Sequence, residues 1–498
     1  MKYILSVDNG LTTTKAVVFT LDGKEIASSL TNTVVESIGS HAEIDMELQW
    51  RNTARVIKES IEKGKINPED IIGVGNTGHG AGLYCIDGNG DPVRKAISSM
   101  DARALGLLNE WEKEGKGTYD RLYQNLWSGQ AIPILGWLKR YEEKSYNKIN
   151  KIFMVKDWII YRLTGEAGME YTDASNSGLV NPVTKEIDSE ILKLYGLEEM
   201  LGGIPPLRKT TDIAGYVTEE ASKITGLKVG TPVMGGVFDV IACALGSGVH
   251  DTDKYSLIAG TWNINTGIKD QLIHSGETIK CSLYMDVKKF IYVESSATSS
   301  VNLEWFVTNI IKGFGGGDLP KGQIYKMIDE GVGNIHPEDS DIIYTPFLYK
   351  SHLSQNLDAS FIGIRAEHGI FNLLRAVFEG VVFAHLKHIE ILRGADIVRK
   401  KAVLSGGASN SNVWCQMFAD ILNMEIMTTQ ASQEGALGTA ICTAVALGEY
   451  KDIKEAANAM VKDGIKFHPN AAMHRVYMKK YEEFSRIIDM FRNKKERV

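Results

Sequence analysis

The sequence predicts an α/β protein of two similar domains that face a common cleft. Its 498 residues exceed the length of one typical domain about threefold. A short apolar run that ends in a polar turn rich in glycine and threonine opens the chain at residues 3–7 and recurs at 255–259. This likeness indicates a repeated plan. The Gly-rich, charged segment 246–253 marks the expected boundary between domains 1–248 and 249–498.

The first half opens with three expected strands joined by short turns. Residues 3–7 form a continuous apolar run, which is typical of a strand buried on both faces. A polar loop at 8–15 separates this run from the second strand, and Asp22-Gly23 is a tight-turn signal before the third. These features predict a three-stranded meander. The elements expected in this half are strands at 3–7, 16–20, 24–29 and 71–75 and helices at 45–63 and 102–114.

The second half follows a related order. The apolar run 255–259 leads into a polar turn, and residues 290–293 are the next expected strand. Apolar residues recur at helical spacing between 369 and 393, which predicts a long, mostly buried helix. A strand at 402–404 then leads into paired glycines and a helix that begins at about Asn412.

The composition excludes several classes of protein. A net charge of −7 argues against a dedicated nucleic-acid binder, because such proteins carry an excess of basic residues. Five scattered cysteines have neither the pairing of a disulfide framework nor the spacing of a zinc site, which favours a reducing compartment. We find no signal peptide and no segment of membrane-spanning length. The expected location is therefore the cytoplasm.

The most informative local motif is VDNGLTTTK, from Val7 to Lys15. A glycine two residues after a strand-terminal aspartate lets the main chain turn so that its amides face a phosphate. The threonines and Lys15 add donors and positive charge, and Asp8 supplies a carboxylate of the kind that Mg²⁺ prefers beside phosphate oxygens. The alternative is a polar hairpin turn that Asp8 merely caps. The motif alone leaves both interpretations open.

An aspartate in an apolar stretch is the second feature. Asp239 lies between Phe238 and Val240 in the segment GGVFDV. A carboxylate is costly to bury, so one in such a position often has a function. The alternative is that Asp239 caps a helix at 240–245.

Two Gly-rich turns follow apolar strands in the second half. Gly260-Thr261 ends the run 255–259, and Gly406-Gly407 lies between an expected strand and an expected helix. Paired glycines at such a turn let a flat ligand lie against the main chain near the amides that start the helix. Turns of this kind also need glycine for packing alone, so neither is specific by itself.

Taken in this order, the four segments VDNGLTTTK, GGVFDV, AGTWNINTG and LSGGASNSNVWCQM resemble the FGGY family of carbohydrate kinases. The resemblance extends from about residue 2 to residue 448. The family belongs to the same superfamily as actin, hexokinase and the large heat-shock chaperones. Membership implies an α/β fold of two actin-like (ribonuclease H-like) ATPase domains around a central cleft. It implies sugar binding, the first phosphate loop and the base in domain 1–248, and the second phosphate loop and adenosine binding in domain 249–498.

The resemblance implies roles for individual residues, with Asp239 as the catalytic base, Asp8 at Mg²⁺, and ATP as the phosphate donor. The residues that it places at the sugar are Gly78, His79, Asp101, Arg103 and Asp239. Those that it places in the first phosphate loop are Asp8, Gly10, Thr12, Thr13 and Lys15. Those that it places in the second phosphate loop and at the adenosine are Gly260, Thr261, Gly406, Gly407 and Ala408, with Ser411 and Asn412 nearby.

The chain departs from the family pattern at two positions. Leu11 stands where relatives often have threonine, so that hydroxyl contact is absent or is supplied by Thr12. Val240 stands where many relatives have a polar residue that touches the sugar, which puts the substrate in doubt more than the reaction. His79 is either a donor to the sugar or a loop histidine.

The substrate implied is a small ketose or polyol. The segments 238–240, 295–306 and 346–349 are most similar to those of L-xylulose (L-xylulose/3-keto-L-gulonate) kinases, with erythritol kinases, D-xylulose kinases and other polyol kinases as alternatives. A non-catalytic sugar or nucleotide sensor and an ATPase chaperone are alternatives of other classes. The expected partners are the sugar or polyol and ATP, without nucleic acid or membrane, and any assembly is expected to be a homodimer.

Overall fold

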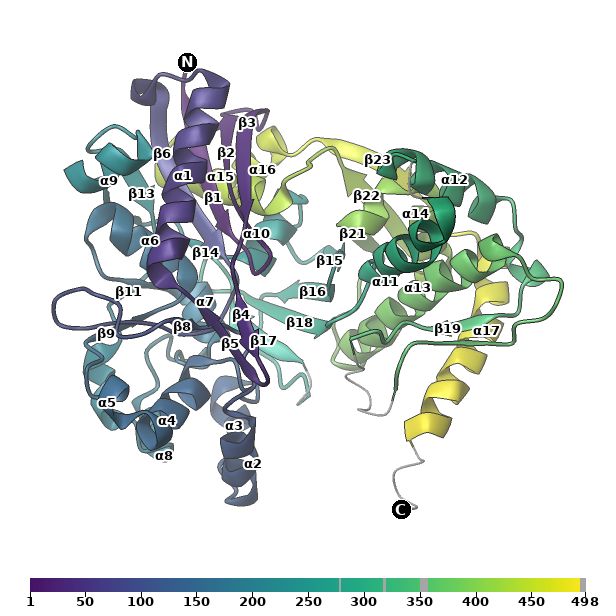
Figure 1. Cartoon of the computed structure of the whole chain (residues 1–498), viewed down its shortest axis with the longest axis horizontal. Helices are drawn as coiled ribbons and strands as arrows, with labels where there is room; N and C mark the ends of the chain where they lie inside the picture. The colour runs from purple at the N-terminus through teal and green to yellow at the C-terminus, as the bar shows by residue number, and fades with distance from the viewer. Residues whose placement is uncertain (277–278, 317–318, 350–356, 493–498) are drawn as a thin grey trace. The chain divides into compact units, whose positions relative to one another are not determined.

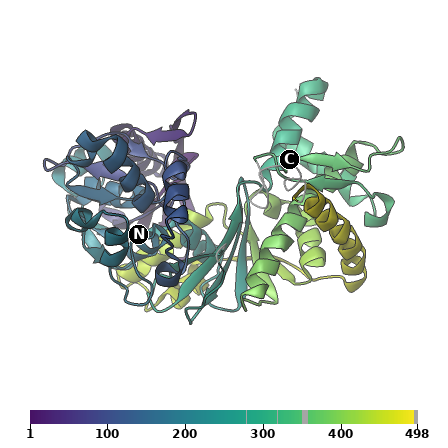
Figure 2. The ribbon, with the colours of Figure 1, turned by 90° about the horizontal axis from the view of Figure 1, so that it is seen from below.

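The computed structural model describes residues 1–276, 279–316, 319–349 and 357–492. The chain divides into two compact units (Figures 1 and 2). Unit 1 comprises Met1–His250, Ile268–Tyr292 and Ala431–Lys462, and unit 2 comprises Asp251–Gly267, Val293–Gln430 and Asp463–Val498. No helix in the described part of the chain has both the length and the apolar character needed to cross a membrane.

The main sheet of unit 1 has the strand order β12-β13-β6-β1-β2-β3, and β14 also pairs with β6. The strands β1 to β3 form the predicted antiparallel meander, and β6 runs parallel to β1. The bounds of these strands are Tyr3–Asn9 for β1, Thr13–Thr20 for β2, Glu25–Asn32 for β3, Ile71–Gly78 for β6, Ile213–Tyr216 for β12, Pro232–Met234 for β13 and Val237–Phe238 for β14.

The helix α1, Met46–Gly64, shows why the local sequence folds as it does. The side chain of Asp45 accepts a hydrogen bond from the amide of Leu48 and so caps the first turn. Lys65 ends the helix in the left-handed conformation. The apolar face of α1 carries Trp50 and Ile57 into the core that it shares with the sheet.

The remaining elements of unit 1 surround this sheet or extend from it. Smaller strands are β4 Glu36–Ile38, β5 His41–Ile44, β7 Tyr84–Ile86, β8 Ala96–Ile97, β9 Lys151–Phe153, β10 Met169–Glu170, β11 Leu207–Arg208 and β17 Lys280–Leu283. The helices are α2 Leu105–Lys113, α3 Tyr119–Leu122, α4 Ala131–Tyr141, α5 Glu143–Tyr146, α6 Val155–Thr164, α7 Tyr171–Asn176, α8 Ser189–Leu194, α9 Glu219–Thr225, α10 Asp239–Gly246, α15 Glu434–Ala446 and α16 Ile453–Met460.

Glycines bring α10 and α15 unusually close together. A Cβ on Gly246 would lie 1.9 Å from the carbonyl oxygen of Glu434, and one on Gly438 would lie 1.9 Å from that of Ala242. Only glycine fits at such positions, so small residues allow α15 to pack against α10 as well as against β1 and β6. The segment Ala431–Lys462 therefore belongs to unit 1 although it lies late in the sequence.

Unit 2 repeats the strand plan of unit 1. Its strands lie in a seven-stranded sheet of order β17-β18-β16-β15-β21-β22-β23. The pairs β15–β16 and β22–β23 are antiparallel, and the pairs β15–β21 and β21–β22 are parallel, as are the corresponding pairs of unit 1. The expected likeness between the two halves is thus present in their sheets. The strands are β15 Lys254–Ala259, β16 Asn263–Lys269, β18 Phe290–Ser296, β21 Lys401–Ser405, β22 Glu425–Thr429 and β23 Asp463–Phe467.

The helices of unit 2 include the long buried helix that the sequence predicts, α13, Ile370–Gly394. It packs against α14, which in turn lies against α17 and β22 (Figure 1). The other elements are α11 Val301–Phe306, a π-helix at Val307–Gly316, α12 Lys321–Gly333, the small strands β19 Ile343–Thr345 and β20 Ser360–Ile362, α14 Asn412–Leu422 and α17 Ala471–Arg492.

Candidate active site

The carboxyl ends of three parallel strands meet at one edge of the unit 1 sheet. β6 lies between β1 and β14, with Asp8 opposite Thr77 on one side and β14 pairing at Thr77 and Gly78 on the other. His79 follows β6 directly, and Asp239 follows β14 directly. The structure therefore brings Asp8, Gly78, His79 and Asp239 to the same edge, where the ends of parallel strands commonly carry a ligand site.

The first predicted phosphate loop is the tight turn between β1 and β2. The amide of Gly10 donates to the carbonyl of Thr13 at 2.9 Å. Lys15 lies opposite Asp8 in the hairpin, with its Nζ 3.1 Å from Asp8 Oδ2. Burial acts to lower the pKa of Lys15, but the charge and hydrogen bond of Asp8, together with Cys243 and Glu434, outweigh burial and raise that pKa. Thr12 is exposed, so its hydroxyl is accessible to a ligand where Leu11 has none.

A buried hydrogen-bond network supports this loop from behind. Asn9 Oδ1 accepts from Gln49 Nε2 and from the Thr53 hydroxyl, both at 2.8 Å and both on α1. Gln49 Nε2 also donates to Thr14 Oγ1 at 2.9 Å. The Thr33 hydroxyl donates to the carbonyl of Gly10 at 2.8 Å. Because the loop is attached to α1 and to the residue that follows β3, these contacts support its conformation without a ligand.

Asp239 is the first residue of α10 and is half-buried. No side-chain hydrogen bond caps this helix, whose N-cap position is Phe238. Burial, and then the negative charges of Asp8 and Asp173, raise the pKa of Asp239 well above its ordinary value. A carboxylate held in this way has a strong affinity for a proton, as a general base requires.

His79 is buried and neutral. Burial lowers its pKa to about 4. Its Nε2 lies 3.4 Å from the hydroxyl of Tyr84, and its Nδ1 has no hydrogen-bond partner among the described residues. A buried ring nitrogen without a partner is costly and leaves a group that a hydroxyl of a ligand could satisfy. This placement is consistent with both interpretations of His79 that the sequence leaves open.

Asp101 and Arg103 form a buried pair. Both oxygens of Asp101 accept from Arg103, from its amide and Nε at 2.8 and 2.9 Å and from its Nη2 at 2.8 Å. The amide of Ala42 donates to Asp101 at 2.6 Å. Arg103 also pairs with Glu43 and lies over the ring of Trp137. The hydrogen bonds found for Asp101 thus go to the protein, which fixes the guanidinium of Arg103.

A cluster of buried charged side chains beside this edge of the sheet was not predicted from the sequence. Lys156 Nζ lies 3.1 Å from Asp157, 3.3 Å from Asp173 and 3.8 Å from Glu170, and all four side chains are fully buried. Burial opposes the charge of Lys156, but the three carboxylates raise its pKa. Burial raises the pKa of Glu170 to about 7. The adjacent charges of Lys156 and Asp157 within the otherwise apolar segment 152–160 were the available signal.

The helix α15 adds two residues that the sequence reasoning also missed. A Cβ on Gly435 would lie 3.1 Å from Asp8 Oδ2 and 3.3 Å from Cys243 Sγ, so the helix start lies directly against these groups. Glu434 is half-buried, and burial raises its pKa while the charge of Lys15 opposes that rise. Both residues come from the late segment of unit 1, far in sequence from Asp8.

In unit 2, the turn after β15 carries the second predicted phosphate loop. The Ser300 hydroxyl donates to the carbonyl of Gly260 at 2.9 Å, and the amide of Ser299 donates to the carbonyl of Thr261 at 3.2 Å. Thr261 itself is exposed. The amide of Gly260 donates to the carbonyl of Trp262 at 3.2 Å, so hydrogen bonds within the turn and to Ser299 and Ser300 fix its shape.

Gly406 and Gly407 lie against this turn. Gly406 has φ +84°, and a Cβ there would lie 2.8 Å from the carbonyl of Ala259. A Cβ on Gly407 would lie 3.0 Å from Ser300 Oγ. Glycine at 406 is therefore required both by the backbone conformation and by the close approach. Ala408 follows and is fully buried.

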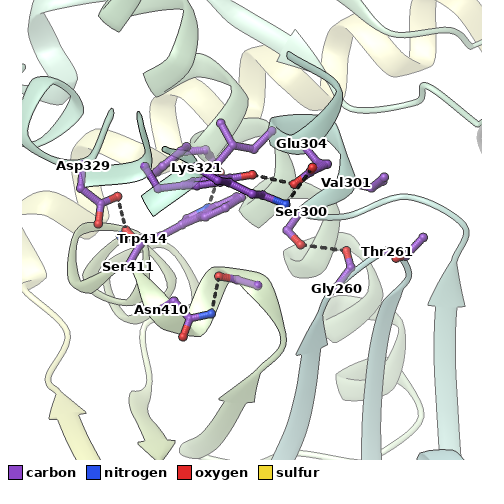
Figure 3. Close-up of a pocket in the computed structure, with 14 residues that line it drawn as sticks. Gly260, Thr261, Ser300, Val301, Glu304, Lys321, Asp329, Asn410, Ser411 and Trp414 are labelled. Atoms are coloured by element: carbon purple, nitrogen blue, oxygen red, sulfur yellow. Dashed lines mark hydrogen bonds and ion pairs between the residues drawn. The ribbon is translucent and has the colours of Figure 1, made fainter. Parts of the chain in front are cut away.

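A cavity of about 600 Å³ opens beside these two turns (Figure 3). Gly260, Thr261, Gly407 and Ser411 are among the residues that line it. Its apolar wall includes Trp414, whose ring stacks on Phe378 at 4.1 Å and 14°. Such a volume, with a flat apolar wall and a few polar groups, suits a nucleoside.

The start of α14 borders the same cavity. Ser411 caps the helix by accepting from the amide of Trp414 at 3.0 Å and donates to Asp329 at 2.7 Å (Figure 3). Burial raises the pKa of Asp329. Asn412 is exposed on the first turn of α14 and is not part of the cavity wall. The sequence did not single out Asp329 because it lies 82 residues before Ser411.

Comparison with known protein families matches a segment in each half of the chain to the same family. The N-terminal domain of the FGGY family of carbohydrate kinases matches residues 3–246, and the C-terminal domain of the same family matches residues 343–447. The two matches cover the candidate first phosphate loop, Asp239 and the Gly406-Gly407 turn.

Individual proteins match over nearly the full length. The chain is 34% identical to a probable L-xylulose kinase of Pasteurella multocida, covering 98% of both chains. It is 31% identical to the L-xylulose/3-keto-L-gulonate kinase of Escherichia coli, covering 98% of this chain and 97% of the relative. Among solved structures, ligand-bound xylulose kinase from Lactobacillus acidophilus shares the fold, with a TM-score of 0.88, 21% identity and 98% coverage of both chains.

Proposed function

Because the chain belongs to the FGGY family of carbohydrate kinases, and is therefore an ATP-dependent sugar kinase, we propose that it phosphorylates L-xylulose or a related pentulose with Asp239 as the base. The observation that carries this proposal is the half-buried carboxylate of Asp239 at the shared edge of β1, β6 and β14. The names of the two relatives at 34% and 31% identity support the choice of sugar.

The base assignment rests on charge and position. Phosphoryl transfer requires the protein to align the acceptor and to neutralise charge, and the acceptor hydroxyl must lose its proton. Asp239 is accessible at the strand edge, and burial together with Asp8 and Asp173 raises its pKa. In this proposal Asp239 takes the proton while His79 and Arg103 hold the sugar.

Each unit carries a glycine turn that is proposed to contact nucleotide phosphate. In unit 1, the hydroxyls of Thr12 and Thr13 would contact phosphate, with Gly10 shaping the turn and Lys15 adding positive charge. In unit 2, Gly260 and Thr261 would contact phosphate. The adenosine would lie in the cavity lined by the residues Gly407, Ser411, Phe378 and Trp414, next to Gly406 and Ala408.

The residues present fit Mg²⁺ bound together with phosphate. Within the described ranges, no three histidine, cysteine or acidic side chains are arranged to hold a metal alone. Mg²⁺ commonly binds through one or two carboxylates plus phosphate oxygens, and Asp8 supplies such a carboxylate. When bound, the ion would neutralise phosphate charge, and Asp8 would be its protein ligand.

The proposal also covers the compartment, the partners and the assembly of the protein. All five cysteines are free thiols, which supports a reducing compartment and hence the cytoplasm. The proposed partners are limited to sugar and ATP, without nucleic acid, and a homodimer is the proposed assembly.

A panel assay tests the function. ADP release is measured with Mg-ATP and, separately, L-xylulose, D-xylulose, L-ribulose, 3-keto-L-gulonate, erythritol and glycerol, and the product is identified by mass. We expect the highest kcat/KM with L-xylulose. A different sugar in first place would overturn the substrate, and ADP release that no sugar accelerates would favour a sensor over a kinase.

A further inference from the structure

A chain of buried polar side chains connects α13 with both segments that flank the Gly260-Thr261 turn of unit 2. His385, in the middle of α13, lies 2.8 Å through its Nδ1 from Asn265 Oδ1 and 3.0 Å through its Nε2 from Ser299 Oγ. Asn265 Nδ2 in turn donates to Asn263 Oδ1 at 2.7 Å. All four residues are fully buried. Polar groups of this kind are retained in a core only when their hydrogen bonds are made.

The partners determine the protonation of His385. Asn265 uses its amide nitrogen to donate to Asn263, so its oxygen faces the imidazole and must accept. Nδ1 of His385 therefore carries the proton, and Nε2 accepts from the hydroxyl of Ser299. Burial, followed by the charge of His388, lowers the pKa of His385 well below its ordinary value, in agreement with a neutral ring.

Both ends of this chain reach the turn. Asn263 is the first residue of β16 and pairs with Ala259 across the hairpin, so it closes the turn on one side. On the other side the amide of Ser299 donates to the carbonyl of Thr261, and the neighbouring Ser300 donates to Gly260. The single imidazole thus fixes the spacing between the two segments that hold the turn.

We propose that His385 is a positioning residue for the Gly260-Thr261 turn: its neutral ring holds Asn265 and Ser299 in place and thereby keeps the turn in the shape that contacts nucleotide phosphate. The inference rests on the proposed role of this turn in binding phosphate. The ring itself lies in the core and does not touch the nucleotide. Loss of the ring would therefore weaken phosphate binding more than adenosine binding, because most of the residues that line the adenosine cavity lie outside this turn.

His388 provides a matched control on the same helix. It is also fully buried and makes two hydrogen bonds, from Nδ1 to Glu294 Oε2 and from Nε2 to Ser296 Oγ, both at 3.0 Å. Both partners lie on β18, and the main-chain carbonyl of Glu294 also accepts from Asn265 Nδ2 at 3.4 Å. A substitution at His388 thus reports the cost of disturbing the core of unit 2 while the side-chain hydrogen bonds of His385 stay in place.

The experiment compares the affinities of ADP and adenosine by calorimetry in the full-length wild type, His385→Asn and His388→Gln. Adenosine lacks the phosphates that the turn would contact. For His385→Asn we expect the Kd of ADP to rise about tenfold, corresponding to one or two lost supporting hydrogen bonds, and the Kd of adenosine to stay within about twofold. For His388→Gln we expect both affinities to stay within about twofold.

A milder variant keeps the inference testable if His385→Asn fails to fold. Ser299→Ala removes the hydroxyl that donates to His385 and leaves the main-chain amide that donates to Thr261, so we expect a smaller loss of the same selectivity. Unchanged ADP affinity in a folded His385 or Ser299 variant overturns the inference. A loss of ADP affinity in His388→Gln as large as that in His385→Asn overturns it as well. A wild type that binds ADP but phosphorylates no sugar refutes the proposed function alone, whereas a wild type that does not bind ADP refutes both.

Discussion

The main-chain amide of Ala81 donates a 3.0 Å hydrogen bond to Oδ1 of Asp173, inside the buried charge cluster of unit 1. Ala81 has φ +60°, a conformation that costs a non-glycine residue about 1–2 kcal/mol. The loop that follows β6 and carries His79 is therefore held in a strained shape by a carboxylate. The other oxygen of Asp173 lies 3.3 Å from Lys156, which keeps the carboxylate in position.

Two variants at Asp173 separate the hydrogen bond from the charge. Asp173→Ala removes the acceptor for Ala81, so we expect the KM for the sugar to rise about tenfold as the loop relaxes. Asp173→Asn keeps an oxygen for Ala81 but removes the charge beside Lys156, so we expect a smaller change in KM and a loss of about 1–3 kcal/mol of stability. Steady-state kinetics and urea unfolding measure the two effects. Equal sugar KM values in the two variants would contradict the role of the hydrogen bond.

Replacement of Asp239 by asparagine tests the proposed base. The variant keeps the size of the side chain but cannot take a proton, so we expect kcat to fall about 10²–10⁴-fold, the usual contribution of general base catalysis. The Kd values of ADP and sugar should change by no more than about threefold. Turnover near that of the wild type would rule out Asp239 as the base.

The proposed metal contact predicts a changed Mg²⁺ requirement in Asp8→Asn. Loss of the carboxylate charge should raise the Mg²⁺ concentration for half-maximal activity about tenfold or more, because one anionic ligand is removed. Lys15→Met is the matched control, since it breaks the same 3.1 Å ion pair without removing a carboxylate. The two variants should differ in metal dependence, measured as rate against free Mg²⁺ at fixed ATP. An identical dependence would show that only the ion pair matters.

Much of the fold could be predicted because its signals are local. The apolar run at the start of the chain, the Asp22-Gly23 turn and the helical spacing before Arg393 correspond to β1, the β2–β3 turn and α13. The placement of α15 could not be predicted in this way. Its close contact with α10 depends on glycines at 246 and 438, which nearly two hundred positions separate, and no local pattern links them.

Some residues of the candidate site could likewise be predicted from the sequence, and others could not. Asp8 and Asp239 stand at strand ends in motifs that sequence order makes specific, and the structure places both at one edge of the sheet. Asp173, Asp329 and His385 were missed because their significance lies in partners far away in the sequence. A buried hydrogen bond leaves no periodic signal, so only the folded chain shows that these polar residues meet.

Gly406 should tolerate no side chain. In Gly406→Ala the new Cβ would approach the carbonyl of Ala259 to 2.8 Å at φ +84°, so we expect a loss of about 2–4 kcal/mol from overpacking and strain. Gly407→Ala is the control, because its new Cβ would meet only the Ser300 side chain at 3.0 Å. Urea unfolding followed by tryptophan fluorescence compares them. Equal stabilities would contradict the close approach at Gly406.

The stability lost in His388→Gln should depend on pH. Burial lowers the pKa of His388 to about 3, whereas an unfolded histidine titrates near 6.5. Between these values the unfolded chain takes up a proton that the folded chain does not, so the contribution of His388 to stability is complete above about pH 6.5 and falls as the pH drops.

Glutamine has no such dependence. We expect the difference in unfolding free energy between wild type and variant to shrink by about 2 kcal/mol from pH 7.5 to pH 5. Urea unfolding of both proteins at each pH measures this difference. A difference that stayed constant would mean that the folded state admits the proton, in conflict with a fully buried imidazole bonded to Glu294 and Ser296.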